Sequence, residues 1–178
     1  MLEQLLNYTI SLYKDVPASV YEGLLSLFCL GCVVSFCIWG FRKGWRKVGL
    51  LLLVEYVFLL YCSTVFCRDV DPEIGHNFHP FWSYRAILDG KDVLLAENFM
   101  NVMVFVPVGI LLGTQIAQKT QKGWLVATGV GLFISVSIEM LQFFLKRGFA
   151  EGDDVMHNVA GGVLGYAVFR GIALIASK

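Results

Sequence analysis

The stretch from Ser137 to Tyr166 reads SIEMLQFFLKRGFAEGDDVMHNVAGGVLGY. It joins the end of one apolar segment of bilayer length to the start of the next, yet it is rich in ionisable and amide side chains. These are Glu139, Gln142, Arg147, Asp153, Asp154, His157 and Asn158. An ionisable side chain in hydrocarbon costs roughly 2.5 to 3.5 kcal/mol even on lenient insertion scales, so each such residue is a candidate for a functional site.

The whole chain is too apolar for an ordinary soluble domain. Its 178 residues are 57% hydrophobic and only 16% charged, and the mean hydropathy is +0.67, whereas soluble domains contain about 25% charged residues. A helix needs about 20 apolar residues to cross the hydrocarbon layer. We therefore predict an all-α, polytopic membrane bundle that forms a single domain, 1–178. The five predicted transmembrane helices are 20–41, 48–66, 99–117, 124–145 and 155–176.

The distribution of lysine and arginine in the connections predicts the orientation of this bundle. The connection 42–47 carries four cations, and the third connection holds Lys119 and Lys122 without an acid, so the positive-inside rule places both in the cytoplasm. The more acidic connection 67–98 is predicted to be an extracellular loop. The N-terminus is then outside and the C-terminus inside, with residues 1–18 forming a helix in the outer interface.

Net charge and cysteine content narrow the possible functions. The chain has 14 basic and 14 acidic residues, and this balance gives no indication of nucleic-acid binding. Five cysteines are present, but the Cys29-x-x-Cys32 pair lacks the second Cys or His pair that a zinc site needs, so we interpret it as buried packing. No metal site and no cofactor are predicted.

The polar residues of the segment ends have helical spacing. Residues three or four apart share one face of a helix, and three predicted helices carry such sets: Glu139 with Gln142, Asp154 with His157 and Asn158, and Asn98 with Asn101. All three sets fall at the outer ends of their helices. We therefore predict one outward-facing pocket, in which Arg147 or water is the expected partner of Glu139.

Two structural alternatives stay open from the residues alone. The polar groups can instead bond one another and hold the helices together. Glu55, in the middle of the second predicted helix, is either the deepest member of the same pocket or a structural hydrogen-bond donor. The pairs Gly109 with Gly113 and Gly161 with Gly165 are interpreted as sites of close helix packing.

Several short motifs occur in a fixed order along the second half of the chain. They are Asn101, Phe105-Val106-Pro107-Val108-Gly109, Ser137-Ile138-Glu139-Met140-Leu141-Gln142, Arg147, Asp153-Asp154, Asn158, Gly161-Gly162 and Gly165-Tyr166, with upstream matches at Arg68 and His79-Pro80-Phe81. In this order and spacing they resemble the VanZ family. The resemblance covers the chain from the second predicted helix onward.

The resemblance implies a small bacterial multi-pass protein of the plasma membrane. It is related to a protein that lowers susceptibility to the glycopeptide antibiotic teicoplanin, which is a phenotype without an assigned reaction. The residues that carry over by motif position are Asn101, Glu139, Gln142, Arg147, Asp154 and Asn158, and we add Asp153 and Arg68 to the expected binding residues. His157 lies outside the motif, and a packing role is expected for it.

Three functions are consistent with these residues. The first is recognition of a cell-envelope lipid, a lipid-linked cell-wall precursor or a lipoglycopeptide at the outer leaflet. The second is an enzyme acting on such a molecule, with Glu139 or Asp154 as general acid or base. The third is a proton-coupled transporter using Glu55 and Glu139, which the short chain and the absence of repeats disfavour. The sequence leaves the oligomeric state open.

Overall fold

The computed structural model describes residues 46–116 and 122–176, together with Pro17, Val20 and Gly23. The predicted interfacial helix 1–18 and the first predicted membrane helix 20–41 therefore lie almost entirely outside the described residues. So does the Cys29-x-x-Cys32 pair.

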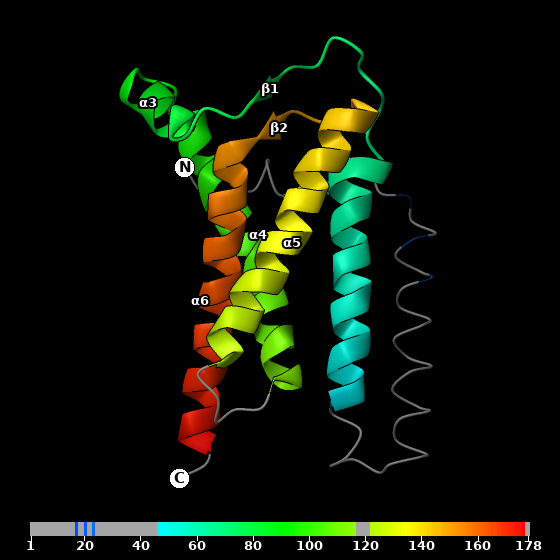
Figure 1. Cartoon of the computed structure of the whole chain (residues 1–178), viewed down its shortest axis with the longest axis vertical. Helices are drawn as coiled ribbons and strands as arrows, with labels where there is room; N and C mark the ends of the chain where they lie inside the picture. Colours follow the sequence, from blue (N-terminus) through cyan, green and yellow to red (C-terminus); the bar gives the residue numbers. More distant parts are fainter. Residues whose placement is uncertain (1–16, 18–19, 21–22, 24–45, 117–121, 177–178) are drawn as a thin grey trace.

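Four helices in the described part of the chain are long and apolar enough to cross a membrane (Figure 1). They are Arg46–Phe66, α4 (Val93–Gln115), α5 (Lys122–Leu145) and α6 (Gly152–Ala176). These helices confirm the all-α membrane bundle and four of the five predicted segments. The last residues of the first of them, Cys62–Phe66, form the π-helical turn η1.

All four of these helices begin earlier than predicted, and the differences are largest for α4 and α6. α4 starts at Val93 and not at residue 99, and α6 starts at Gly152 and not at residue 155. In both cases the added turn carries polar side chains, Asn98 and Asp153, which are buried inside the protein. A hydropathy criterion ends a segment at such residues because it assumes that every side chain faces lipid.

Glycines bring α4 and α6 into backbone contact. A Cβ atom on Gly161 would lie 2.0 Å from the carbonyl oxygen of Val102, and one on Gly165 would lie 2.0 Å from that of Val106. Small residues at such crossings allow close approach where no hydrophobic effect drives helices together. The predicted packing role of Gly161 and Gly165 is confirmed.

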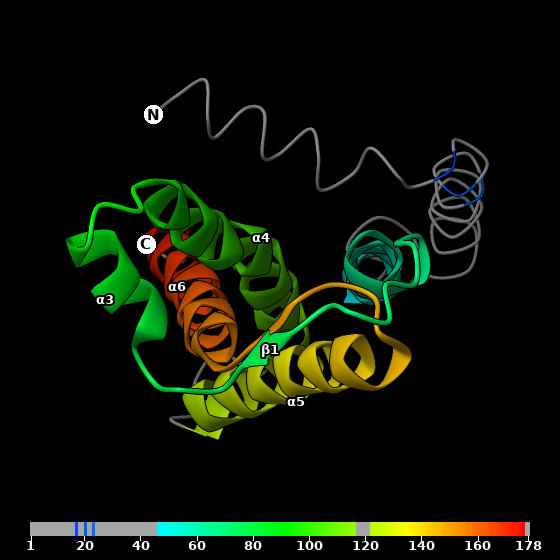
Figure 2. The same ribbon diagram turned by 90° about the horizontal axis from the view of Figure 1, so that it is seen from above.

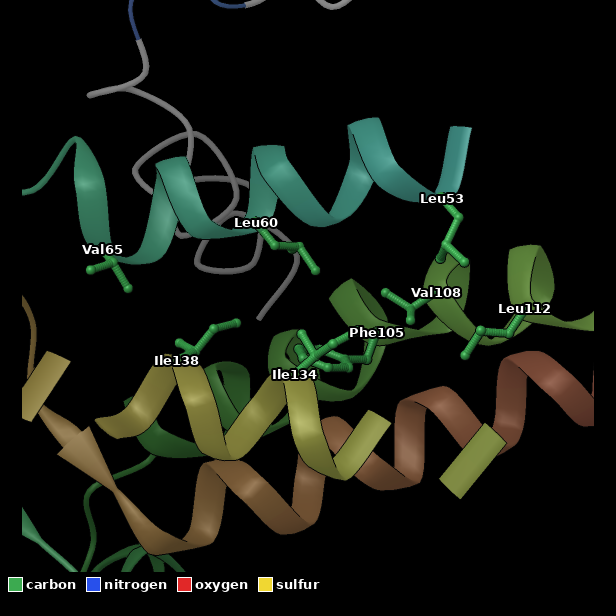
Figure 3. Close-up of a cluster of buried hydrophobic side chains, with 8 residues drawn as sticks. All are labelled: Leu53, Leu60, Val65, Phe105, Val108, Leu112, Ile134 and Ile138. Atoms are coloured by element: carbon green, nitrogen blue, oxygen red, sulfur yellow. The ribbon is translucent and has the colours of Figure 1, made fainter. Parts of the chain in front are cut away.

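The apolar core lies between the Arg46–Phe66 helix, α4 and α5 (Figure 3). It consists of Leu53, Leu60, Val65, Phe105, Val108, Leu112, Ile134 and Ile138. Large apolar side chains also cover the outside of the bundle: Leu125 is 75% exposed and Phe133 is 73% exposed. A surface of this kind is suited to lipid and not to water.

The predicted extracellular loop 67–98 is a structured cap at one end of the bundle. It contains β1 (His76–Asn77) and α3 (Trp82–Leu88). β1 pairs in parallel with β2 (Ala150–Glu151), which lies in the connection between α5 and α6. Figures 1 and 2 show this loop crossing over one end of the bundle, which we call the α3 end.

Candidate functional site

A cavity of about 230 Å³ lies inside the bundle toward the α3 end. The Arg46–Phe66 helix and the residues after it, α4, α5, β2 and α6 all contribute side chains to its wall. The lining residues are Leu60, Thr64, Arg68, Glu97, Asn98, Asn101, Val104, Phe105, Ile138, Glu139, Gln142, Phe149, Glu151, Asp154 and Asn158. Three of them, Leu60, Phe105 and Ile138, also belong to the apolar core, so the cavity adjoins the core.

Glu139 lies on α5 and is only 5% exposed. Its Oε2 atom accepts a hydrogen bond from the main-chain N–H of Glu151 at 2.7 Å. This bond ties the part of α5 nearest the α3 end to β2, and the strand pair in turn ties β2 to the loop that carries α3. Glu139 therefore lines the cavity and also connects α5 to its cap.

Amide side chains form a second part of the wall. Gln142 donates its Nε2 hydrogen to the carbonyl oxygen of Thr64 at 3.1 Å, while its buried Oε1 atom has no hydrogen-bond partner among the described residues. Asn158 donates to Ser135 Oγ at 2.9 Å. Asn101 also lines the cavity. The structure thus brings together seven predicted residues: Arg68, Asn98, Asn101, Glu139, Gln142, Asp154 and Asn158.

Arg147 does not take the place expected for it. Its Nη1 atom donates to the carbonyl oxygen of Phe66 at 2.6 Å, and it is not among the residues that line the cavity. The reason is local: α5 ends at Leu145, and Lys146 adopts a left-handed conformation with φ of 56°, which turns the chain out of the helix. The expected pairing of Glu139 with Arg147 is therefore wrong.

Arg68 is the cation that lines the cavity instead. Its Nε atom donates to the carbonyl oxygen of Ser63 at 3.4 Å. Its Nη1 atom would lie 2.8 Å from a Cβ atom on Gly148, whose φ is +102°. Glycine is therefore required at position 148 both for its backbone conformation and for the space that Arg68 occupies.

Asp153 was expected to bind ligand, but the structure places it outside the cavity wall. The residue is fully buried. Its Oδ1 accepts from the Phe81 N–H at 2.7 Å, and its Oδ2 accepts from the N–H and the hydroxyl of Ser83 at 3.0 and 2.7 Å. These donors belong to the first turn of α3 and the residue before it, so Asp153 fixes the position of α3.

Two neighbours of Ser83 also hold α3 in place. Trp82 donates its indole N–H to Glu151 Oε2 at 3.1 Å, and the Tyr84 hydroxyl bonds His157 Nε2 at 2.8 Å. Three consecutive side chains thus attach α3 to β2 and α6. His157 contacts Tyr84 and does not line the cavity, which agrees with the packing role expected for it.

Sequence reasoning missed two carboxyl groups in the wall, Glu97 and Glu151. Glu97 was counted with the loop because the predicted helix began at residue 99. It lies four residues before Asn101, so helical spacing identifies it once the start of α4 is known. Glu151 lies in a two-residue strand, and no periodic pattern marks it.

Glu151 lies outside the membrane-spanning helices, and its pKa is raised by burial and by repulsion from neighbouring carboxylates. Burial, followed by the nearby carboxylates of Asp154 and Glu97, raises the pKa of Glu151 to about 8, although the Trp82 indole N–H acts in the opposite direction. Glu151 is therefore mostly protonated at neutral pH. With every group ionised, four carboxylates and the one guanidinium would leave the wall with a formal charge of −3.

The structure shows where Glu55 lies, a point that the sequence left open. Glu55 is buried but does not line this cavity, and its Oε1 atom has no hydrogen-bond partner. In the part of the chain that the structure covers, no three His, Cys, Asp or Glu side chains are grouped so that they could hold a metal ion. Cys62 and Cys67 are free thiols.

Comparison with known proteins assigns the chain to a family. The family model described as VanZ/LLP1 matches residues 26–175. "Protein VanZ" of Enterococcus faecium is 32% identical over 73 residues, which cover 41% of this chain and 44% of that protein, so the match spans less than half of the relative's length. No solved structure is significantly similar. The chain belongs to the VanZ/LLP1 family of membrane proteins.

Proposed function

We propose that the cavity binds the polar head of a cell-envelope lipid, a lipid-linked cell-wall precursor or a lipoglycopeptide, at the outer leaflet of the plasma membrane. Binding of this kind would contribute to resistance against glycopeptides such as teicoplanin. The observation that carries the proposal is a polar cavity lined by the helices of a membrane bundle. Membership of the VanZ/LLP1 family and the match to Protein VanZ support the link to resistance.

The size of the cavity limits what enters it. Sites that enclose a drug-sized ligand measure roughly 300 to 1,000 Å³, and this one measures about 230 Å³. A headgroup or one sugar ring fits this space, whereas the rest of a glycopeptide would remain outside.

The composition of the wall favours binding over covalent catalysis. Amides and carboxylates offer donors and acceptors for the hydroxyl and amine groups of a polar head. Thr64 is the one lining residue with a hydroxyl side chain, and its Oγ1 donates to the carbonyl oxygen of Leu60 at 2.6 Å. No general base is bonded to it, so Thr64 is not an activated nucleophile.

A second candidate function is acid–base catalysis on the same class of molecule. The observation in its favour is the cavity's set of carboxyl groups in unlike environments, where Glu151 holds a proton near neutral pH. Pairs of this kind supply a general acid and a general base. In this case Glu139 or Asp154 would exchange a proton during turnover.

Substitution of Glu139 separates the two functions. Glu139→Gln keeps the size and an acceptor for the Glu151 N–H but cannot ionise, so a binding site should retain part of its function. Glu139→Leu removes the acceptor and should abolish it. In a catalytic site, Glu139→Gln should be as inactive as Glu139→Leu, and Asp154→Asn should be inactive as well.

The measurement is the teicoplanin susceptibility of a sensitive bacterium that expresses each variant. The control is Glu73→Gln, which makes the same change at an exposed residue outside the cavity. Equal amounts of each variant in the membrane must be verified. If Glu139→Leu protects as well as the unaltered chain, the cavity has no part in resistance.

A further inference from the structure

We infer that the group entering the cavity is a cation, a protonated amine carried by an amphipathic molecule. This inference rests on the proposed binding function and specifies its ligand chemistry. It follows from the charge of the wall, from a buried acceptor without a partner, and from the absence of a metal-type arrangement among the described residues.

The acidic character of the wall comes from four different elements. Glu97 lies on α4, Glu139 on α5, Glu151 on β2 and Asp154 on α6. These residues are far apart in sequence and surround an enclosed space, unlike a solvated acidic run on a surface. Against these four carboxyl groups, Arg68 is the one cationic side chain among the lining residues.

Gln142 supplies an independent indication. The residue is 6% exposed, and its Nε2 donates to the Thr64 carbonyl oxygen. That bond assigns the other end of the amide, Oε1, as the acceptor, and Oε1 is buried without a partner. A buried acceptor of this kind needs a donor, and an ammonium group has three donors and no acceptor.

The protonation of Glu151 supports the same ligand. Burial and the carboxylates of Asp154, Glu97 and Asp153 hold its pKa near 8 against the Trp82 N–H. An ammonium group among these carboxylates would stabilise the ionised form of Glu151 and release its proton. Amine binding should therefore strengthen as pH rises toward 8, while a primary alkylamine stays protonated.

The arrangement does not suit a bare metal ion. No three candidate ligand side chains are grouped closely enough in the described part of the chain, although four carboxyl groups line the cavity. The cavity measures about 230 Å³, and its carboxyl groups are spread over the wall. An organic cation that fills this space can contact several of them at once.

Binding of dodecylamine to the full chain in phosphatidylcholine nanodiscs tests the inference. The ammonium head of dodecylamine is compared with the neutral head of dodecanol on the same alkyl chain, by the ligand-dependent rise in unfolding temperature. Dodecylamine should bind at least about tenfold more tightly, and Asp154→Asn and Glu97→Gln should each weaken it by about tenfold. Asp89→Asn, at an exposed residue outside the cavity, should leave dodecylamine binding unchanged.

Competition identifies the natural source of the amine. Displacement of dodecylamine by phosphatidylethanolamine in the nanodisc assigns the ammonium group to a membrane lipid. Displacement by added teicoplanin assigns it to the antibiotic.

Failure of the amine inference and failure of the proposed function give different experimental results. If dodecanol binds as tightly as dodecylamine, or if neither carboxylate substitution weakens dodecylamine, the amine inference is wrong even when Glu139→Leu abolishes resistance. If Glu139→Leu leaves resistance intact while dodecylamine still binds selectively, the proposed function fails and the amine site stands.

Discussion

At the scale of single residues, neighbouring acids in one motif have different roles. Asp153 and Asp154 are adjacent, and about 100° separates successive side chains around a helix. Asp153 accepts three hydrogen bonds from Phe81 and Ser83, whereas Asp154 lines the cavity. The pair therefore combines an anchor for α3 with a candidate ligand-binding group.

Glu151 should make stability depend on pH. Its pKa is raised from 4.5 to about 8 in the folded protein, so the folded state holds this proton more tightly than the unfolded chain does. Its contribution is fully present below about pH 4.5 and is lost as pH rises through about 8. The unfolding temperature of the unaltered chain should thus fall over this window.

The matched variant for this prediction is Glu151→Gln, which keeps an acceptor for Trp82 and cannot ionise. It should show a shallower fall in unfolding temperature, measured by circular dichroism in nanodiscs at several pH values. Parallel pH profiles for the two proteins would contradict the assignment.

At the scale of the helices, the crossing of α4 and α6 depends on which side of α6 a glycine occupies. A Cβ at Gly161 would lie 2.0 Å from the Val102 carbonyl oxygen, whereas a Cβ at Gly162 would have no atom of a neighbour within 4 Å. The helix contact therefore requires glycine at position 161 but not at position 162. Substitutions at these adjacent positions can be compared directly.

Alanine substitution tests this contact. Gly161→Ala should destabilise the protein by about 1 to 3 kcal/mol, because backbone at the crossing must move apart. Gly162→Ala should be neutral or stabilising by up to about 1 kcal/mol, since alanine favours helix. Reversible unfolding in mixed micelles measures both, and equal effects would refute the close-packing role.

At the scale of the whole molecule, the orientation in the membrane decides which compartment the cavity serves. α3, β1 and β2 lie at one end of the bundle, while α5 begins and α6 ends at the other (Figure 1). The positive-inside rule predicts that the α3 end is external. The cavity then opens toward the outer leaflet.

Single cysteines introduced into a cysteine-free chain test this orientation. Leu88, 87% exposed on α3, should react as cysteine with an impermeant reagent in intact cells. Lys122, exposed at the start of α5, should react only after permeabilisation. The reverse labelling pattern would mean that the cavity opens toward the cytoplasmic leaflet, and it would overturn the proposed function.

The sequence by itself determined the membrane class, four of the helices, the glycine positions at which helices pack closely, and seven of the residues that line the cavity. These features depend on hydropathy, helical spacing and side-chain size, which are local along the chain. Asn101, Gln142 and Asn158 were found because each lies on one face of a long helix.

Only the tertiary structure decided how the α3 end is assembled. The exclusion of Arg147 from the cavity, the role of Asp153 and the place of Glu151 depend on contacts between distant segments, such as β1 with β2 and Ser83 with Asp153. Such contacts follow from where turns direct the chain after each helix ends. Hydropathy and periodicity describe the helices and carry no information about those directions.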